Sequence, residues 1–242
     1  MGLSKLFKKK DETPHCSAVI VAAGSSKRMG SDKIMANLGG MPVLARTLMA
    51  FQNSGLVDEI IVVTRMDRIE EIAQACKQYQ ISKVAKVVCG GATRMESALA
   101  GVSEINPKAK LVAIHDGARP LVTDLIIKRT VYAARDFLSA VPVLKNTDTL
   151  KKIDEEGIIV EPVDRETVVR VQTPQVFSAE LIKGALTKAV TDNLPLTDDC
   201  SAMEMMGVKT HTVTGDEDNI KLTTPRDFFI AEAILRNRGE LE

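Results

Sequence analysis

The stretch SAVIVAAGSSKRMGSDKIM, from Ser17 to Met35, decides how the rest of the chain is interpreted. It opens with a run of small and apolar residues that is typical of a buried strand. Two alanines and a glycine follow, and three cations, Lys27, Arg28 and Lys33, then fall within seven positions. Glycine allows close backbone approach, and backbone N–H groups can hold phosphate oxygens. The stretch therefore predicts a strand that ends in an anion-binding loop.

The composition predicts one globular domain with an aliphatic core. The chain has 242 residues, of which 45% are hydrophobic, and this is enough to bury a sizeable core. Tryptophan is absent and aromatic residues make up only 3%, so the core must be built from aliphatic side chains.

Charge and cysteine content exclude several classes of protein. The formal net charge is zero, so the protein has no general basic field that would attract nucleic acid. We therefore do not expect nucleic acid as a partner. The four cysteines form no CxxC pair, which favours thiols in a reducing cytoplasm, and the three histidines show no metal-ligand spacing. No segment approaches the roughly 18 apolar residues of a membrane helix, so we expect no stable membrane association.

Apolar runs and longer helical patterns alternate along most of the chain. Strands are predicted at 18–23, 59–64, 83–88 and 111–116. Helices are predicted at 42–52, 67–79, 94–105 and 123–138. Short apolar strands separated by helices predict an α/β fold with a mostly parallel sheet and helices on both faces.

The alternation stops after Val143. Residues 144–172 contain short β-like runs with a turn at Glu156-Gly157 and an interruption at Pro162, which predicts a hairpin that we call the β-arm. A two-stranded ribbon is marginal alone, so it is expected to pack on something, such as a second copy of the chain. The pattern then resumes, with a helix at 178–190, a strand at 208–213 and a helix at 225–237.

The domain boundaries follow from these patterns. Residues 1–16 are expected to form a flexible tail, and 17–242 a single domain with the β-arm inserted in it. The tail has charge but no apolar core of a secretory signal. A short membrane-touching helix through Leu3, Leu6 and Phe7 is the alternative to a solvated tail.

Polar and glycine residues follow three of the predicted strands, where ligands bind in an open α/β sheet. These residues are Ala22, Ala23, Gly24, Arg28 and Lys33 after the first strand, Gly90, Gly91, Arg94 and Ser97 after the third, and Asp116, Gly117 and Arg119 after the fourth. Several strand ends that supply glycine together with arginine or lysine indicate a polyphosphate site. Neither GxGxxG nor the P-loop motif fits the first loop.

Eight blocks of sequence carry a resemblance to a known family. They are AAGSSKRMGSDK, GGATRMES, HDGARPLV, DTLK, VDR, QTPQVF, TDDCSAME and DNIKLTTPRD, in this order between about residues 17 and 235. The chain resembles the 2-C-methyl-D-erythritol 4-phosphate cytidylyltransferases of the non-mevalonate isoprenoid pathway. The resemblance implies a Rossmann-like nucleotidyltransferase fold and a homodimer formed through the β-arm.

The same resemblance implies roles for individual residues. Nucleotide binding is implied for Ala22, Ala23, Gly24, Gly90, Gly91, Arg94, Ser97 and Gly117. Catalytic roles are implied for Arg28, Lys33, Arg165 and Lys221. Substrate binding is implied for Asp116, Arg119, Thr149 and Thr197, with Thr149 and Arg165 entering the partner's site. The sequence departs from the family around the first-loop lysine, where Asp32-Lys33-Ile34 replaces the usual Pro-Lys-Gln.

The implied reaction joins CTP to a small polyol phosphate and releases pyrophosphate. A phosphate monoester is already anionic near neutral pH, since its second pKa is about 6, so no general base is required. Catalysis then depends on positioning and charge neutralisation, and Mg²⁺ is expected to bridge the CTP phosphates. Asp116 is expected to contact either the metal or the substrate hydroxyls.

Two rival functions remain open from the sequence. A ribitol 5-phosphate cytidylyltransferase would share the fold and the chemistry and differ only in the polyol. A non-catalytic nucleotide-binding regulator would keep the pocket and release no pyrophosphate. The cations Arg28, Lys33 and Lys221 argue against the regulator.

Overall fold

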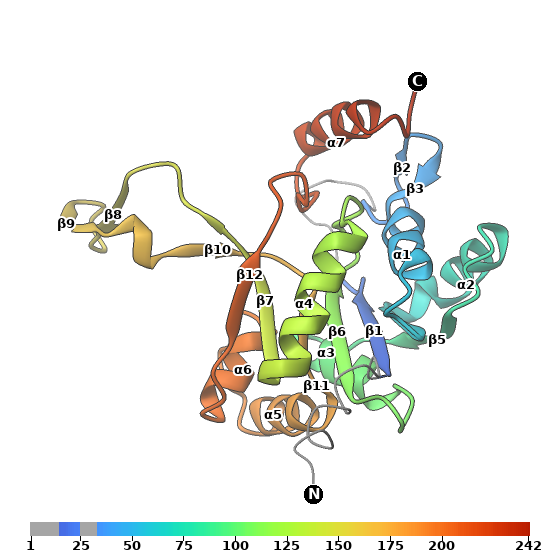
Figure 1. Cartoon of the computed structure of the whole chain (residues 1–242), viewed down its shortest axis with the longest axis horizontal. Coiled ribbons are helices and arrows are strands. Elements are labelled where there is room, and N and C mark those ends of the chain that lie inside the picture. Colours follow the sequence, from blue (N-terminus) through green and yellow to red (C-terminus); the bar gives the residue numbers. More distant parts are fainter. Residues whose placement is uncertain (1–14, 25–32) are drawn as a thin grey trace, which may run out of the picture.

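The computed structural model describes residues 15–24 and 33–242. Within these ranges an eight-stranded mixed sheet forms the centre of the molecule, and helices cover both of its faces (Figure 1). The α/β fold with a mostly parallel sheet that the sequence predicts is confirmed.

The parallel half of the sheet consists of the predicted strands. They are β1 (Cys16–Val21), β4 (Glu59–Thr64), β5 (Val84–Cys89) and β6 (Leu111–Asp116). β1 lies between β4 and β6, and β5 forms the edge beyond β4. β1, β4 and β6 are almost entirely buried, which explains their continuous apolar sequences. All four strands point their carboxyl ends toward one edge of the sheet.

The other half of the sheet is mixed. It contains β7 (Ser139–Lys145), β10 (Val169–Val171), β11 (Gln175–Ser178) and β12 (His211–Thr214). β11 runs antiparallel to both β6 and β7, and β12 runs parallel to β7. The sequence patterns gave no separate strand for β7 or β11, because β7 continues directly into the β-arm and β11 has only four residues.

Two hydrophobic cores lie on opposite faces of the sheet. One face packs against α1 (Val43–Asn53), α2 (Ile69–Gln78) and α4 (Asp124–Phe137). The other packs against α3 (Arg94–Ser103), α5 (Ala179–Thr191) and α6 (Asp199–Met205). Aliphatic side chains dominate both cores, as the composition predicts.

A third, smaller core contains the C-terminal helix. It packs α7 (Pro225–Asn237) against the two-stranded hairpin of β2 (Asn37–Leu38) and β3 (Met41–Pro42). The predicted helix at 225–237 is confirmed at both ends. Short hairpins and short helices were missed: β2, β3 and the seven-residue α6 are too brief to show a period in the sequence.

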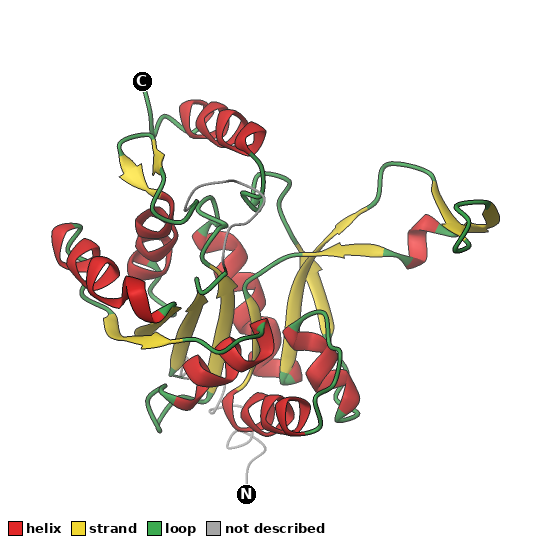
Figure 2. Cartoon of the chain, turned by 180° about the vertical axis from the view of Figure 1, so that it is seen from behind, coloured by secondary structure: helices red, strands yellow, loops and turns green. Residues whose placement is uncertain are grey.

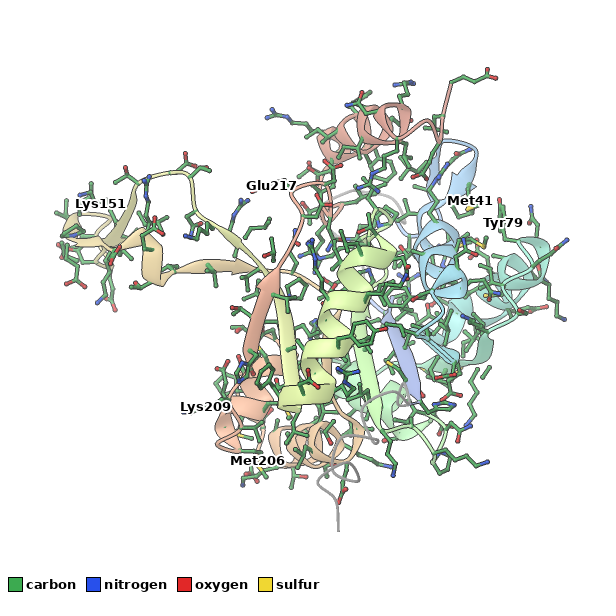
Figure 3. All side chains as sticks on the ribbon, viewed as in Figure 1. Met41, Tyr79, Lys151, Met206, Lys209 and Glu217 are labelled. Carbon is green, nitrogen blue, oxygen red and sulfur yellow. The ribbon has the colours of Figure 1, made fainter. Side chains whose placement is uncertain are left out.

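The β-arm projects away from the body of the molecule (Figures 1 and 2). Its distal part is a two-stranded antiparallel sheet of β8 (Leu150–Ile153) and β9 (Ile159–Val163), and a 3-10 helix at Arg165–Thr167 leads back to β10. Gly157 makes the expected turn with φ +82°. The prediction that Pro162 interrupts the hairpin is wrong, because Pro162 pairs with Lys151 inside β9. Both strands of a two-stranded ribbon are edge strands, and an edge strand tolerates a proline, which has no N–H to donate. Lys151 marks the far end of the arm in Figure 3.

Two sequence predictions fall wholly or largely outside the described residues. These are the tail at 1–16, of which only His15 and Cys16 are described, and the first-loop cations Lys27 and Arg28. Cys16 is already the first residue of β1. No helix within the described ranges is long and apolar enough to cross a membrane.

Candidate active site

A pocket of about 370 Å³ opens at the carboxyl ends of β1, β5 and β6. It is lined by the loops after these three strands and by the loop between β12 and α7, which we call the late loop. The lining residues are Val21, Ala22, Ala23, Gly24, Lys33, Ile34, Gly91, Ala92, Thr93, Arg94, Ser97, Asp116, Ala118 and Lys221. The pocket therefore brings together residues from four of the predicted blocks, at the edge of the sheet where the sequence placed them.

The loop after β1 contributes backbone and one described cation. The N–H of Ala22 donates to the Val63 carbonyl oxygen at 2.7 Å, which continues the pairing of β1 with β4 past the end of the strand. Gly24 lines the pocket, and no atom of the described residues lies within 4 Å of a notional Cβ there. Lys33 lines the pocket, whereas Arg28 lies outside the described residues.

The loop after β5 is shaped by a glycine and a helix N-terminus. A Cβ at Gly90 would lie 2.7 Å from Ser97 Oγ and 2.8 Å from Ala23 Cβ, so no larger residue fits between the two loops. Thr93 caps α3 in a capping box with Glu96. The N-terminus of α3 faces the pocket, and its dipole favours negative charge there.

Gly117 supports the pocket from behind, and Ser97 forms part of its wall. The N–H of Gly117 donates to the Val21 carbonyl oxygen at 2.9 Å, and a Cβ there would meet Ala22 Cβ at 3.1 Å. Gly117 itself does not line the pocket, but the next residue, Ala118, does. Ser97 lines the pocket and is buried, and its hydroxyl donates to the Thr93 carbonyl oxygen at 2.9 Å.

Asp116 is the centre of a cluster of charges at the base of the pocket. Lys221 Nζ lies 2.8 Å from its Oδ2, Arg119 Nε lies 3.6 Å from the same oxygen, and Arg94 Nη2 lies 3.6 Å from Oδ1. Burial alone would raise the pKa of Asp116, but these three cations outweigh it and hold the pKa below its ordinary value. Asp116 is thus an anion whose charge is already shared by three cations.

Arg119 binds the late loop and does not form part of the pocket wall. Its Nη1 donates to the Asn219 carbonyl oxygen at 2.7 Å, and the N–H of Leu222 donates to the Ala118 carbonyl oxygen at 2.9 Å. These two bonds flank Lys221 and fix it beside Asp116. Arg119 does not line the pocket, so its sequence-based assignment to substrate contact stays a prediction.

Residues 172–174, between β10 and β11, and Gln175 at the start of β11 connect three parts of the site. Gln172 donates to the Asp216 carbonyl oxygen at 2.8 Å and so holds the loop that carries Lys221. Thr173 Oγ1 accepts from the N–H of Asp116 at 3.1 Å. Gln175 contacts the start of α6 through its side-chain amide. The sequence block QTPQVF therefore has a structural role that its spacing alone did not reveal.

His115 is a buried histidine with both ring nitrogens in contact with hydrogen-bonding partners. Nδ1 lies 3.0 Å from Thr173 Oγ1 and Nε2 lies 3.2 Å from the Arg119 carbonyl oxygen. Burial lowers the pKa of His115 to about 4, against the opposing effect of Asp116. The ring is therefore neutral near pH 7 and supports the site rather than serving as a base within it.

Asp199 is a site residue that the sequence reasoning missed. It is fully buried, and its Oδ2 lies 2.7 Å from Arg94 Nη2. Burial raises the pKa of Asp199, and the guanidinium of Arg94 opposes that shift. The only signal in the sequence was the Asp-Asp pair of the TDDCSAME block, which is also what a helix N-terminus looks like.

Three predicted site residues lie apart from this pocket. Thr149 and Arg165 belong to the β-arm and are exposed, and Arg165 Nη1 donates to the Thr147 carbonyl oxygen at 3.2 Å. Thr197 is exposed just before α6. None of the three lines the pocket.

The described acidic side chains provide little for a metal ion. Asp116 is the single carboxylate among the residues that line the pocket, and no group of three or more His, Cys, Asp or Glu side chains in residues 15–24 and 33–242 could hold a metal. Such a pocket fits a cation that reaches the site already bound by the phosphates of a ligand.

Comparisons with known proteins agree with one another. Residues 16–237 match the family model described as IspD: 2-C-methyl-D-erythritol 4-phosphate cytidylyltransferase. The 2-C-methyl-D-erythritol 4-phosphate cytidylyltransferase of Halalkalibacterium halodurans is 42% identical over 224 residues, which cover 92% of this chain and 97% of the relative. The enzyme of the same name from Clostridium novyi is 39% identical over 91% of this chain and 96% of its own length.

Solved structures show the same similarity. The 4-diphosphocytidyl-2C-methyl-D-erythritol synthase of Anaerococcus prevotii superposes with a TM-score of 0.83 at 32% identity, and the alignment covers 93% of this chain and all of that one. The 2-C-methyl-D-erythritol 4-phosphate cytidylyltransferase of Thermus thermophilus gives 0.76 at 30% identity, with 92% and 99% covered. The similarity thus extends over the sheet, the pocket and the β-arm alike.

Proposed function

Because the chain belongs to the 2-C-methyl-D-erythritol 4-phosphate cytidylyltransferase family, we propose that its pocket joins CTP to 2-C-methyl-D-erythritol 4-phosphate. The products are 4-diphosphocytidyl-2-C-methyl-D-erythritol and pyrophosphate, in isoprenoid precursor biosynthesis by the non-mevalonate pathway. One observation carries the proposal beyond family membership: Lys33, Arg94 and Lys221 line a pocket that also contains Gly24 and Gly91, and Asp116 is the single acidic residue among the described residues that line it.

The bonds that change define what the site must do. A phosphate oxygen of the acceptor attacks the α-phosphorus of CTP, and the bond from that phosphorus to the β-phosphate oxygen breaks, so that pyrophosphate leaves. The attacking oxygen is anionic near neutral pH and needs no proton removed. The protein must bring two polyanions together and stabilise charge on the α-phosphate. Lysine and arginine side chains suit this task, and the neutral, buried His115 is not needed for it.

The described residues divide into two groups in this proposal. The backbone of Ala22, Ala23 and Gly24 and the N-terminus of α3 hold the nucleotide. Lys33 and Lys221 reach the phosphates, with Lys221 held in place by Asp116 and by the loop bonds of Arg119. The role of Arg28 as a second first-loop cation is proposed from the family pattern alone, since it lies outside the described residues.

Mg²⁺ fits the site as a companion of CTP. Because Asp116 is the one carboxylate among the described residues that line the pocket, the ion would be held chiefly by the nucleotide phosphates and water, with Asp116 as the side chain available to it. When bound, it would neutralise part of the triphosphate charge. Three cations, Lys221, Arg94 and Arg119, compete with a metal ion for Asp116. This favours the alternative that the carboxylate orients these cations and the acceptor hydroxyls.

We also propose that two copies of the chain form a homodimer through the β-arm. The arm exposes a row of apolar side chains that a solvated ribbon does not require: Ile153, Ile158, Ile159, Val160, Val168, Val169 and Val171. Thr149 and Arg165 do not line the pocket of their own chain. A dimer through the arm would cover the apolar row and bring Arg165 to the acceptor end of the partner's pocket.

The test is a CTP-dependent pyrophosphate assay with a panel of acceptors. We expect turnover with 2-C-methyl-D-erythritol 4-phosphate at a higher kcat/KM than with ribitol 5-phosphate. A preference for ribitol 5-phosphate would assign the chain to that rival activity. CTP binding with no pyrophosphate release for any acceptor would leave a nucleotide-binding regulator. Because all four cysteines are free thiols, the assay is run under reducing conditions, which match the proposed cytoplasmic location.

A further inference from the structure

We infer that Asp199 is a positioning residue, which holds the guanidinium of Arg94 at the pocket and away from Asp116. Asp199 does not line the pocket, whereas Arg94 does, so the carboxylate acts from behind the cation. The inference rests on the proposed function in one respect: it takes Arg94 as part of the nucleotide site.

The geometry favours Asp199 as the principal partner of Arg94. Nη2 of Arg94 lies 2.7 Å from Asp199 Oδ2 and 3.6 Å from Asp116 Oδ1. Asp199 is fully buried, while the Arg94 side chain keeps 29% of its surface exposed. The other terminal nitrogen of Arg94, Nη1, is buried and has no hydrogen-bond partner among the described residues, so the guanidinium keeps donor capacity for a ligand while Nη2 pairs with Asp199.

The position of Asp199 is itself fixed by the start of α6. Asp198 caps the helix by accepting from the N–H of Ser201 at 3.1 Å, and Gln175 Nε2 donates to Asp198 Oδ2 at 3.0 Å. Gln175 Oε1 also accepts from the N–H of Cys200 at 3.1 Å. Asp199 lies between these two anchored residues, so its backbone is tied to β11 in the central sheet.

Asp199 also keeps two cations on separate carboxylates. Lys221 lies 2.8 Å from Asp116, which is the distance of a direct ion pair, and Arg94 lies farther from that carboxylate. Without the charge of Asp199, the nearest anion for Arg94 becomes Asp116. Arg94 would then compete with Lys221, and both cations would leave the positions from which they face the pocket.

A purely structural pair would behave differently. A buried ion pair often contributes little net stability, and its loss would change the melting temperature without changing affinity for a ligand that the pair does not touch. A positioning role changes ligand affinity instead. The two roles are therefore separated by measuring CTP binding and thermal stability on the same variants.

The first experiment is titration calorimetry of CTP on Asp199→Asn, an isosteric change that removes the charge. We expect the Kd for CTP to rise about five- to tenfold, which corresponds to the net contribution of one hydrogen bond from the displaced guanidinium. Glu204→Gln is the matched control, because it removes one negative charge from the exposed side of the same helix. The control is expected to bind CTP as the wild type does. A Kd for Asp199→Asn within twofold of the wild-type value would overturn the inference.

The second experiment asks whether Asp199 acts through Arg94. Arg94→Gln leaves Asp199 as a buried unpaired charge, and adding Asp199→Asn removes it, so the double variant should melt at a higher temperature than Arg94→Gln. Its Kd for CTP should equal that of Arg94→Gln, because no guanidinium remains to be positioned. A further loss of affinity of threefold or more in the double variant would contradict the inference. This pair also keeps the inference falsifiable if Asp199→Asn alone does not fold, because a further loss of affinity in the double variant would still contradict it.

The outcomes distinguish this inference from the proposed function. If the wild-type protein neither binds CTP nor releases pyrophosphate, the proposed function fails. If the wild type does both and the Asp199 variants bind CTP equally well, only the inference about Asp199 fails.

Discussion

The polar residues beneath the pocket and those of the β-arm differ in what surrounds them. Beneath the pocket, Asp116, Asp199 and His115 are buried, and each contacts partners from distant parts of the same chain. In the arm, ion pairs such as Lys152–Glu161 lie in solvent, and the apolar Ile159 is 63% exposed. The fold of one chain accounts for the first region, whereas the second region leaves apolar side chains exposed, which is what the proposed dimer would cover.

The largest expected effect comes from truncating an apolar side chain in each region. Ile20→Ala in β1 removes a fully buried side chain and should lower the free energy of unfolding by about 2–5 kcal/mol. Ile159→Ala in β9 should change it by less than about 0.5 kcal/mol at low protein concentration. Urea titrations measure both variants. Equal destabilisation by the two changes would mean that the arm packs on its own chain.

Lys33→Ala should give the next largest effect, on catalysis. Losing a cation that stabilises charge in the transition state typically lowers kcat about 10²–10³-fold. Lys209→Ala, an exposed lysine far from the pocket and labelled in Figure 3, is the control and should leave kcat unchanged. If kcat of Lys33→Ala stays within a few-fold of the wild type, the role proposed for Lys33 is wrong.

The buried His115 predicts a pH dependence of stability that the solvated arm cannot supply. Its pKa is about 4 in the folded protein and about 6.5 when unfolded, so the unfolded chain binds more protons between these values. The contribution of His115 to the free energy of unfolding should therefore be fully present above pH 6.5 and should fall by about 3 kcal/mol on acidification to pH 4. The group contributes no further change below that pH.

The measurement is urea unfolding at pH 7.5 and pH 4.5 for the wild type and His115→Gln. The variant removes the titrating group, so its difference in stability between the two pH values should be smaller by roughly 2 kcal/mol or more. An identical pH dependence in both proteins would show that other groups cause the acid sensitivity.

Much of the fold and of the pocket could be predicted from the sequence, because strong local patterns set them. Of the four parallel strands, β1, β4 and β6 are almost entirely buried and have continuous apolar sequences. The residues that follow β1, β5 and β6 place Gly24, Gly91, Arg94 and Asp116 at one edge of the sheet. The β-arm was predictable because its polar, β-like runs break the alternation of strands and helices.

Features that depend on distant contacts were not predictable. Asp199 follows Asp198, and nothing local distinguishes a capping carboxylate from one that pairs with Arg94 behind the pocket. Arg119 has the sequence position of a ligand contact, yet its guanidinium holds the loop at Asn219, a hundred residues away. β7 and β11 pair with each other only after the chain returns from the arm, so no short-range period identifies them.

The smallest expected effect, and the sharpest test of the comparison, concerns Arg165 in the β-arm. An arginine can bind a phosphate through two N–H groups at once, which lysine cannot do, so Arg165→Lys should lower kcat about tenfold and leave the Kd for CTP unchanged.

If Arg165 serves the partner's site, an Arg165→Ala protein mixed with a Lys33→Ala protein should regain activity after subunit exchange. A mixed dimer has one site with both defects and one with neither, and random exchange makes half of the dimers mixed, so activity should approach about a quarter of the wild-type value. Exchange is verified independently with differently labelled subunits. If subunits exchange and the mixture remains as inactive as its parents, Arg165 does not complete the site of a neighbouring subunit, and the arm would need another explanation for its exposed apolar surface.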